Sequence, residues 1–199
     1  MILEFKKVFV LAPHADDAEF GCGGLIARLF ESGSIVYSLV FSAAEERKKE
    51  MIRASSILGI KKAFMFNLPI RNLGKYRQKI LDKLIEMKKT FKPDLVLQPS
   101  LNDIHQDHQV IAEEGVRAFK NTNLWAYEVL ANNLTFDFQL FITINEGQVE
   151  KKIKAIQCYQ SQNHRNYLDG NFIRSLARVR GVQIGADYAE SFGVIREIL

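Results

Sequence analysis

The sequence has few of the residues that mark fibrous, disordered or disulfide-stapled proteins. It contains 4 prolines, 12 glycines and 2 cysteines in 199 residues. These numbers exclude a collagen-like or low-complexity chain, and Cys22 and Cys158 are too few for a disulfide framework. No stretch approaches the roughly 20 apolar residues of a membrane-spanning helix, and the first residues lack the apolar run of a signal peptide. We therefore expect a cytoplasmic protein without a membrane span, in which both cysteines are reduced thiols.

Dense blocks of basic residues are also missing. The net charge is +4 and the isoelectric point is about 9.0, but the lysines and arginines are scattered and lack interleaved aromatics. This distribution is typical of a solvated surface rather than a nucleic-acid interface, although it favours a mildly anionic substrate. The length predicts a single domain over residues 1–199, because domains average roughly 150 residues.

Short β-branched runs alternate along the chain with longer segments of helical periodicity. This alternation predicts an α/β fold of the Rossmann-like type, with a mostly parallel sheet and helices on both faces. Strands are expected at residues 8–12, 35–41, 62–66, 95–98, 124–127, 136–145 and 188–198, and helices at about 25–33, 44–58, 75–90, 107–120 and 147–160. Residues 163–185 are expected to form a loop and a short helix. In such a fold, reactive residues lie in loops that leave the carboxyl ends of strands.

The first polar motif begins where the first predicted strand ends. Residues 13–19 have the sequence Pro-His-Ala-Asp-Asp-Ala-Glu, so two adjacent carboxylates, Asp16 and Asp17, follow His14 closely. Like charges repel and loop polar groups are costly to bury, and a bound cation removes both costs. The alternative interpretation is that one of the two aspartates caps the following helix and that His14 packs nearby.

A second polar motif follows the strand expected at residues 95–98. Residues 103–108 have the sequence Asp-Ile-His-Gln-Asp-His, so three of the four histidines fall in the two motifs, whereas His164 lies elsewhere. A histidine and an aspartate from one loop and a histidine from another supply three nitrogen and oxygen ligands. Three such ligands with an open position for water are typical of catalytic zinc, whereas structural zinc has four closed ligands. The two motifs together therefore predict a catalytic metal site.

These motifs resemble those of the LmbE/PIG-L family of metal-dependent de-N-acetylases. The resemblance rests on residues 13–19, on the Gly-Cys-Gly-Gly run at 21–24 and on His-Gln-Asp-His at 105–108. It extends to Arg47, Glu50, Ala54 and Leu58-Gly59, to Tyr-Gln-Ser-Gln at 159–162 and to Ala-Glu-Ser-Phe at 189–192. It therefore spans nearly the whole chain.

The chain departs from the family pattern at two places. The usual motif His-Pro-Asp-Asp-Glu differs here, because Ala15 replaces the proline and Ala18 precedes Glu19. Many members carry an aspartate after a Leu-Pro pair, where this chain has Ile70 and Arg71. The positions that match the family's metal ligands and base are intact.

The resemblance implies an LmbE-like domain that removes the acetyl group from an N-acetylated amino sugar such as an N-acetylglucosamine unit. The implied ligands of Zn²⁺, or of Fe²⁺ or another divalent transition metal, are His14, Asp17 and His108. Asp16 would act as general base and then as acid for attack by a zinc-bound water. His105, in its protonated form, would stabilise the oxyanion, with Asp103 or Asp107 orienting its ring.

Arg47, Arg71 and Asp103 are the candidate substrate-binding residues, and the arginines could reach a hydroxyl, phosphate or carboxylate of the sugar. The expected partner is a small or conjugated N-acetyl amino sugar, and the resemblance implies a homo-oligomer. Two alternatives are a non-catalytic sugar-binding protein of the same fold and a non-haem iron oxygenase with a facial triad. A third is a dinucleotide-binding domain, but residues 21–24 lack the Gly-x-Gly-x-x-Gly spacing that it requires.

Overall fold

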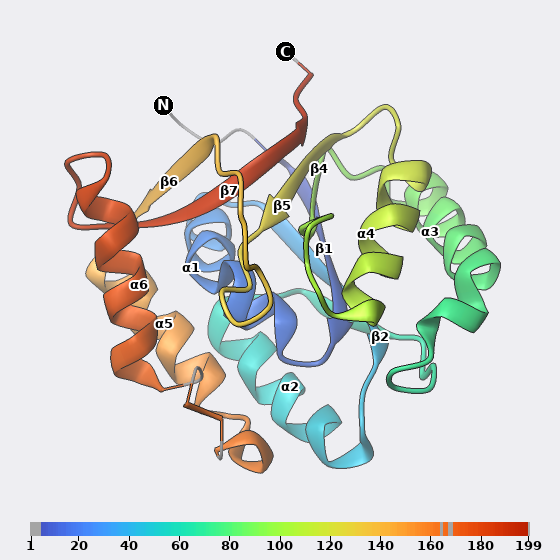
Figure 1. Cartoon of the computed structure of the whole chain (residues 1–199), viewed down its shortest axis with the longest axis horizontal. Coiled ribbons are helices and arrows are strands. Elements are labelled where there is room, and N and C mark those ends of the chain that lie inside the picture. The colour runs from blue at the N-terminus through green and yellow to red at the C-terminus, as the bar shows by residue number, and fades with distance from the viewer. Residues whose placement is uncertain (1–4, 164, 167–168, 199) are drawn as a thin grey trace.

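The computed structural model describes residues 5–163, 165–166 and 169–198, and one seven-stranded sheet forms its centre (Figure 1). The strand order is β3-β2-β1-β4-β5-β7-β6. The strands are β1 (Lys7–His14), β2 (Ile35–Ser42), β3 (Lys62–Met65), β4 (Leu95–Pro99), β5 (Asn123–Tyr127), β6 (Leu140–Ile144) and β7 (Tyr188–Arg196). Strands β1 to β5 pair in parallel, whereas β7 runs antiparallel to both β5 and β6. The predicted α/β fold with a mostly parallel sheet is confirmed.

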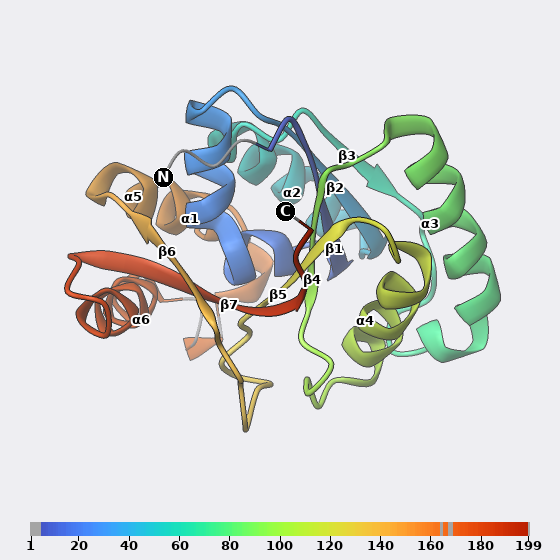
Figure 2. The same ribbon diagram turned by 90° about the horizontal axis from the view of Figure 1, so that it is seen from above.

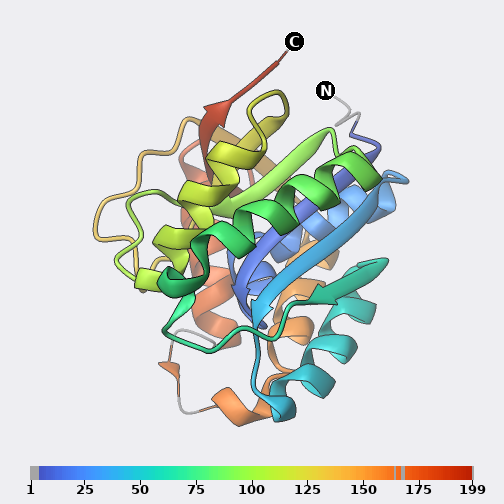
Figure 3. The ribbon, with the colours of Figure 1, turned by 90° about the vertical axis from the view of Figure 1, so that its right-hand side faces the viewer.

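Helices cover both faces of the sheet, as Figures 1 and 2 show. One face carries α1 (Asp17–Glu31), α2 (Glu45–Leu58), α5 (Glu146–Ile156) and α6 (Gly170–Val182). The other face carries α3 (Arg77–Phe91) and α4 (Gln106–Ala118), which lie in front of the sheet in Figure 3. Two short 3-10 helices are η1 (Leu73–Tyr76) and η2 (Gln160–Gln162). Among the described residues, none of the helices has the length and apolar character needed to span a bilayer.

Strand β1 lies in the interior of the sheet because its side chains are apolar on both faces. Every residue of β1 after Lys7 is buried. Val8 and Val10 pack on the α1 side, whereas Phe9 and Leu11 pack on the α3 side. Successive residues of a strand point to opposite faces, and burial of each of these side chains contributes roughly 2 kcal/mol. This packing holds the residue at the carboxyl end of β1 in place.

The carboxyl ends of β1, β2, β4 and β5 meet at one edge of the sheet, since these strands are parallel. Strand β1 lies between β2 and β4, so the order in which the chain adds strands reverses there. In open α/β sheets such a reversal leaves a crevice at the carboxyl edge, because the loops on its two sides diverge. The loops after β1 and β4 flank this crevice, and they carry the two polar motifs.

The strand predicted over residues 136–145 is shorter in the structure. Only Leu140–Ile144 belongs to the sheet. The side-chain oxygen of Gln139 accepts a hydrogen bond from the N–H of Val194 at 2.9 Å. The Gln139 side chain thus accepts the hydrogen bond that the backbone of a longer β6 would otherwise accept from the N–H of Val194 in β7.

Residues 163–185, expected as a loop and a short helix, contain the 13-residue helix α6. The side chain of Asp169 accepts a hydrogen bond from the N–H of Phe172 and caps the helix. Arg174 forms ion pairs with two glutamates of α5, and Arg180 pairs with a glutamate that follows β5. These partners are distant in the sequence, so the local pattern of residues does not reveal the length of α6.

Candidate metal centre and active-site pocket

The first motif lies where β1 ends and α1 begins. His14 is the last residue of β1, and its N–H donates a hydrogen bond to Asp17 Oδ2 at 2.7 Å. Helix α1 already starts at Asp17, ahead of its apolar periodicity, and a break at Cys22 (φ −146°) separates its first turn from the rest. Asp16 stands just before the helix, but its side chain makes no capping hydrogen bond. Helix capping therefore does not explain this aspartate, which is buried together with Asp17.

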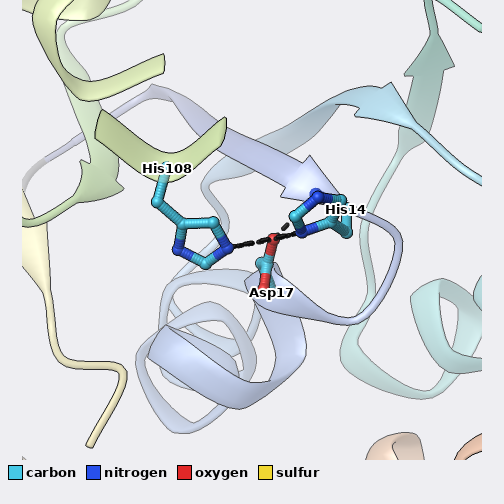
Figure 4. Close-up of side chains that lie close together, drawn as sticks. All are labelled: His14, Asp17 and His108. Atoms are coloured by element: carbon cyan, nitrogen blue, oxygen red, sulfur yellow. Dashed lines mark hydrogen bonds and ion pairs between the residues drawn. The ribbon is translucent and has the colours of Figure 1, made fainter. Parts of the chain in front are cut away.

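The second motif lies at the start of α4. Asp103 Oδ1 accepts a hydrogen bond from the N–H of His105 at 2.8 Å. His105 Nδ1 in turn accepts a hydrogen bond from the N–H of Asp107 at 3.1 Å, so His105 is the N-cap of the helix. His108 follows in the first turn and faces the end of β1 (Figure 4).

Three donor atoms of the two motifs form a nearly equilateral triangle (Figure 4). Asp17 Oδ2 lies 3.2 Å from His14 Nδ1 and 3.2 Å from His108 Nε2, and the two nitrogens are 3.3 Å apart. Zinc binds nitrogen and oxygen ligands at roughly 2.0–2.1 Å in a tetrahedron, so neighbouring ligands lie about 3.4 Å apart. The triangle therefore has the dimensions of one face of such a tetrahedron, and its residues fit a metal ion with a remaining open position.

A buried carboxylate supports each histidine of the triangle from behind. Asp107 Oδ2 lies 3.1 Å from His14 Nε2, and Asp103 Oδ2 lies 2.8 Å from His108 Nδ1. Neither aspartate exposes any surface. A carboxylate on the outer nitrogen leaves the inner nitrogen of a neutral ring free to bind a metal, and metal-binding histidines are usually supported in this way. The structure thus places Asp103, expected to contact substrate, behind His108.

His105 is oriented by the backbone rather than by an aspartate side chain. Its Nδ1 accepts the amide proton of Asp107, while the carboxylate of Asp107 turns toward His14. Because Nδ1 is an acceptor, a neutral ring carries its proton on Nε2. Burial, followed by the charges of His108 and His14, lowers the pKa of His105. The structure therefore differs from the expectation of a protonated His105 held by a carboxylate.

The two histidines of the triangle have raised pKa values. Burial alone would lower the pKa of His14, but hydrogen bonds to Asp107 and Asp17 raise it to about 9. Burial would also lower the pKa of His108, but the charge of Asp17 and the hydrogen bonds with Asp103 and Asp17 raise it to about 10. Both rings are therefore in the positively charged, doubly protonated form at neutral pH when no cation is bound.

The two adjacent aspartates have opposite pKa shifts. Burial would raise the pKa of Asp17, but the charge of His108 and hydrogen bonds with His108 and His14 hold it well below its usual range. For Asp16, burial and then the charge of Asp17 raise the pKa, and the nearby Arg47 only partly opposes them. Asp17 thus remains charged, whereas Asp16 accepts a proton more readily than an ordinary carboxylate.

A second group of donor atoms shares His14. The ligand atoms of His14, His105 and Asp107 also lie within 4.8 Å of one another, and these two groups are the candidates among the described residues. The oxygens of Asp107, however, already accept hydrogen bonds from the N–H groups of Arg71 at 2.7 Å and Leu73 at 3.1 Å. Because this carboxylate is committed to the backbone, the first triangle is the better candidate metal centre.

A pocket of about 370 Å³ opens over the triangle. All three residues of the triangle line it, together with Asp16, His105 and both candidate arginines, Arg47 and Arg71. Arg47 Nη1 lies 3.6 Å from Asp16 Oδ1. The two aspartates behind the histidines do not line the pocket. Seven of the nine predicted site residues thus line the pocket. The other two, Asp103 and Asp107, are buried behind the histidines.

Several pocket residues were not candidates from the sequence. Val129 and Asn132 follow β5, Phe20 lies in α1, and Arg165 precedes α6. Val129 and Asn132 follow the carboxyl end of a parallel strand, and this position could have identified them as candidate pocket residues from the sequence. Arg165 comes from a distant segment without such a signal. His164, the fourth histidine, lies outside the described residues.

Glu19 and Tyr159 lie beneath the first motif. The hydroxyl of Tyr159 donates a hydrogen bond to the carbonyl of Ala15. Burial raises the pKa of Glu19 to about 8, and this side chain is 1% exposed. Glu19 does not line the pocket, and among the described residues its buried Oε2 has no hydrogen-bond partner.

The fold and the site define a class of protein. It is an α/β protein with a candidate metal centre of two histidines and one aspartate at the carboxyl edge of a mainly parallel sheet. The family model for PIG-L, the GlcNAc-PI de-N-acetylases, matches residues 9–119, which include both polar motifs. The chain belongs to this family.

Known proteins resemble the chain over nearly its whole length. The diacetylchitobiose deacetylase of Thermococcus kodakarensis is 24% identical and aligns with 94% of this chain and 82% of its own length. The structure of a conserved protein from Thermus thermophilus covers 96% of both chains, with a TM-score of 0.81 and 26% identity. GalB, the 4-carboxy-2-hydroxymuconate hydratase of Pseudomonas putida, covers 98% of both chains with a TM-score of 0.77 and 21% identity. A protein named as a hydratase shares this fold, so the fold alone does not determine the reaction.

Proposed function

We propose that the chain is a metal-dependent deacetylase that hydrolyses the N-acetyl group of an amino sugar such as an N-acetylglucosamine unit. The observation that carries the proposal is the buried carboxylate of Asp16, which lines the pocket beside the donor triangle. Hydrolysis of an amide requires a base next to an activated water. Membership of the de-N-acetylase family and the deacetylase among the relatives support the same reaction.

The metal ligands in this proposal are His14, Asp17 and His108, the residues of the triangle. Their nitrogen and oxygen donors suit Zn²⁺, and Fe²⁺ is the alternative. When bound, the ion supplies Lewis-acid activation of water and of the amide carbonyl. Asp103 and Asp107 hold the two histidines in the orientation that ligation needs.

Asp16 is the proposed general base and acid. Arg47, with its nitrogen 3.6 Å from the carboxylate, favours the charged form that accepts a proton from the attacking water. Burial and Asp17 raise the pKa of Asp16, so the proton can stay on its carboxyl oxygen until the amide nitrogen takes it up. The nitrogen can leave only as a protonated amine, and Asp16 supplies this proton.

His105 is the proposed donor to the oxyanion. Its Nδ1 is occupied by the amide of Asp107, so the Nε2–H of the neutral ring is the group available for donation into the pocket. A neutral donor suffices for this role, and loss of one such donor typically costs about 10²- to 10³-fold in rate.

The pocket volume agrees with a sugar substrate. About 370 Å³ is near the lower end of small-molecule sites, which span roughly 300–1,000 Å³. A single sugar unit fits this volume better than a long oligosaccharide does. Arg47 and Arg71 are the proposed contacts to its substituents. Asp103 is proposed as a positioning residue for His108 instead of a substrate ligand.

Release of acetate from N-acetylglucosamine and N,N'-diacetylchitobiose by the zinc-loaded protein tests the proposal. The variant Asp16→Asn is expected to keep about one zinc per chain by elemental analysis and to lose roughly 10²- to 10⁴-fold in kcat. The exposed Asp137 in the loop before β6 offers the matched control Asp137→Asn, which is expected to keep both metal and turnover.

Other outcomes would assign a different function. Near-normal turnover of Asp16→Asn would remove this residue from the mechanism. Binding of N-acetyl sugars without acetate release would identify a sugar-binding protein of the same fold. Oxygen-dependent turnover with an oxoacid would indicate the iron oxygenase instead.

A further inference from the structure

Three arginines line the pocket wall, namely Arg47, Arg71 and Arg165. The carboxylates on the same wall are Asp16 and, in the candidate metal centre, Asp17. Asp17 already contacts both histidines of the triangle, and Asp16 faces Arg47 at 3.6 Å. Arg71 therefore adds cationic charge that neither pocket carboxylate balances.

The backbone of Arg71 is held in an unusual conformation next to the metal centre. Its φ is 61°, in the left-handed region that residues with a side chain rarely adopt. Its N–H donates a hydrogen bond to Asp107 Oδ2 at 2.7 Å, and the same oxygen lies 3.1 Å from His14 Nε2. A single carboxylate thus ties Arg71 to a candidate metal ligand and fixes the place from which its side chain lines the pocket.

The guanidinium of Arg71 is available to a ligand. The residue is exposed, and among the described residues no carboxylate forms an ion pair with it. Its position on the pocket wall, with its N–H bound to the buried carboxylate of Asp107, distinguishes Arg71 from an arginine that is only solvated at the surface. A guanidinium presents a planar fork of donors that matches both carboxylate and phosphate oxygens.

We propose that the substrate is an acidic N-acetyl amino sugar, whose carboxylate or phosphate is bound by Arg71 while its acetamido group lies at the metal centre. This inference rests on the proposed deacetylase function. It adds that the part of the substrate that does not react carries a negative charge.

The test compares acidic and neutral sugars with the zinc-loaded protein. N-acetylglucosamine 6-phosphate and N-acetylglucosamine 1-phosphate present a phosphate, and N-acetylmuramic acid presents a carboxylate. N-acetylglucosamine and N,N'-diacetylchitobiose are the neutral references. The kcat/KM for acetate release from at least one acidic sugar is expected to exceed that of the neutral ones about ten- to a hundredfold, as one charge-assisted contact predicts. The three acidic probes distinguish phosphate from carboxylate recognition.

The variant Arg71→Gly separates the side chain from the backbone. Glycine adopts a positive φ without strain, so the N–H bond to Asp107 and the metal site stay intact while the guanidinium is lost. Its ratio of kcat/KM for acidic over neutral sugars is expected to fall about ten- to a hundredfold, with zinc content unchanged. Lys92→Gly is the matched control. Lys92 is exposed, has a φ of 51° and ends α3 far from the pocket wall, so the ratio is expected to stay unchanged.

The outcomes separate this inference from the proposed function. Equal cleavage of neutral and acidic sugars, or an unchanged ratio in Arg71→Gly, overturns the acidic substrate and leaves the deacetylase function standing. If no sugar releases acetate, the deacetylase function fails, and calorimetric titration of the same sugars into zinc-loaded Asp16→Asn decides the inference. Binding of acidic sugars that Arg71→Gly weakens at least tenfold supports it, and equal or absent binding overturns it.

Discussion

Binding of zinc to the metal-free protein is expected to release about two protons per ion at pH 7. Hydrogen bonds and charges from buried aspartates raise the pKa of His14 to about 9 and that of His108 to about 10, against the opposing effect of burial. Both rings are therefore protonated at pH 7, and a histidine must be neutral to bind a metal. Exchange of two protons for one divalent cation leaves the buried charge unchanged, so the same pair of supporting aspartates stabilises both forms.

The size of the effect follows from these pKa values. Removing both protons at pH 7 reduces the apparent zinc affinity by about five powers of ten relative to high pH, or about 7 kcal/mol. The affinity is expected to rise about a hundredfold per pH unit between pH 7 and 9, since two protons are displaced. The rise should level off above pH 10, where both rings are neutral.

Isothermal titration calorimetry measures the proton count directly. Zinc is titrated into metal-free protein at pH 7 in several weakly coordinating buffers, and the slope of the enthalpy against the ionisation enthalpy of the buffer gives the protons released. His105→Gln is expected to leave the count near two, because burial and its histidine neighbours lower the pKa of His105. Release of fewer than one proton would refute the assignment of raised pKa values to the triangle histidines.

Three further predictions concern metal affinity and the stability of the fold. Asp103→Asn is expected to reduce zinc affinity about 10- to 100-fold in chelator competition while the protein stays folded, and unchanged affinity would contradict its role behind His108. Glu190→Gln is expected to lower the free energy of unfolding, measured in urea, by about 3–5 kcal/mol. The reason is that the buried Lys152, whose Nζ lies 2.6 Å from Glu190 Oε1, loses its charge partner. A loss below about 1 kcal/mol would refute this prediction. Metal-free protein is expected to melt at lower temperature as pH rises from 6.5 to 10, since the raised pKa values of the triangle histidines and of Glu19 favour protonated forms that are lost over this range. The zinc-loaded protein should keep only the part of this decline that Glu19 contributes.

The parallel part of the fold was predictable because its signals are local. Strands β1, β2 and β4 are apolar and β-branched runs, and each is followed by a segment of helical periodicity. The polar motifs come directly after two neighbouring parallel strands, so the meeting of His14 with His108 follows from the strand order. The antiparallel end of the sheet and the helix α6 that precedes β7 were harder to predict. Helix α6 forms ion pairs with α5 and with the segment after β5, which are distant in the sequence.

The pairing of the supporting aspartates could not be predicted in the same way. Both aspartates of the second motif lie within four residues of His105, so proximity in the sequence suggested that one of them orients its ring. In the structure the helical turn directs the Asp107 carboxylate across to His14 and leaves only its amide for His105. The direction of a side chain at a helix start depends on the neighbouring strand, which the sequence does not place in space.

The start of α4 organises most of the site from six consecutive residues. The carboxylate of Asp103 contacts the ring of His108 and accepts a hydrogen bond from the N–H of His105. The carboxylate of Asp107 contacts the ring of His14 and accepts a hydrogen bond from the N–H of Arg71. The two aspartates therefore support different metal ligands, and neither can replace the other. Because one carboxylate joins a candidate metal ligand to the backbone of an arginine on the pocket wall, the position of a bound acidic group would be coupled to the position of the metal. A change at Asp107 should thus impair metal affinity and charge selectivity together, whereas a change at Asp103 should impair metal affinity and leave charge selectivity unchanged.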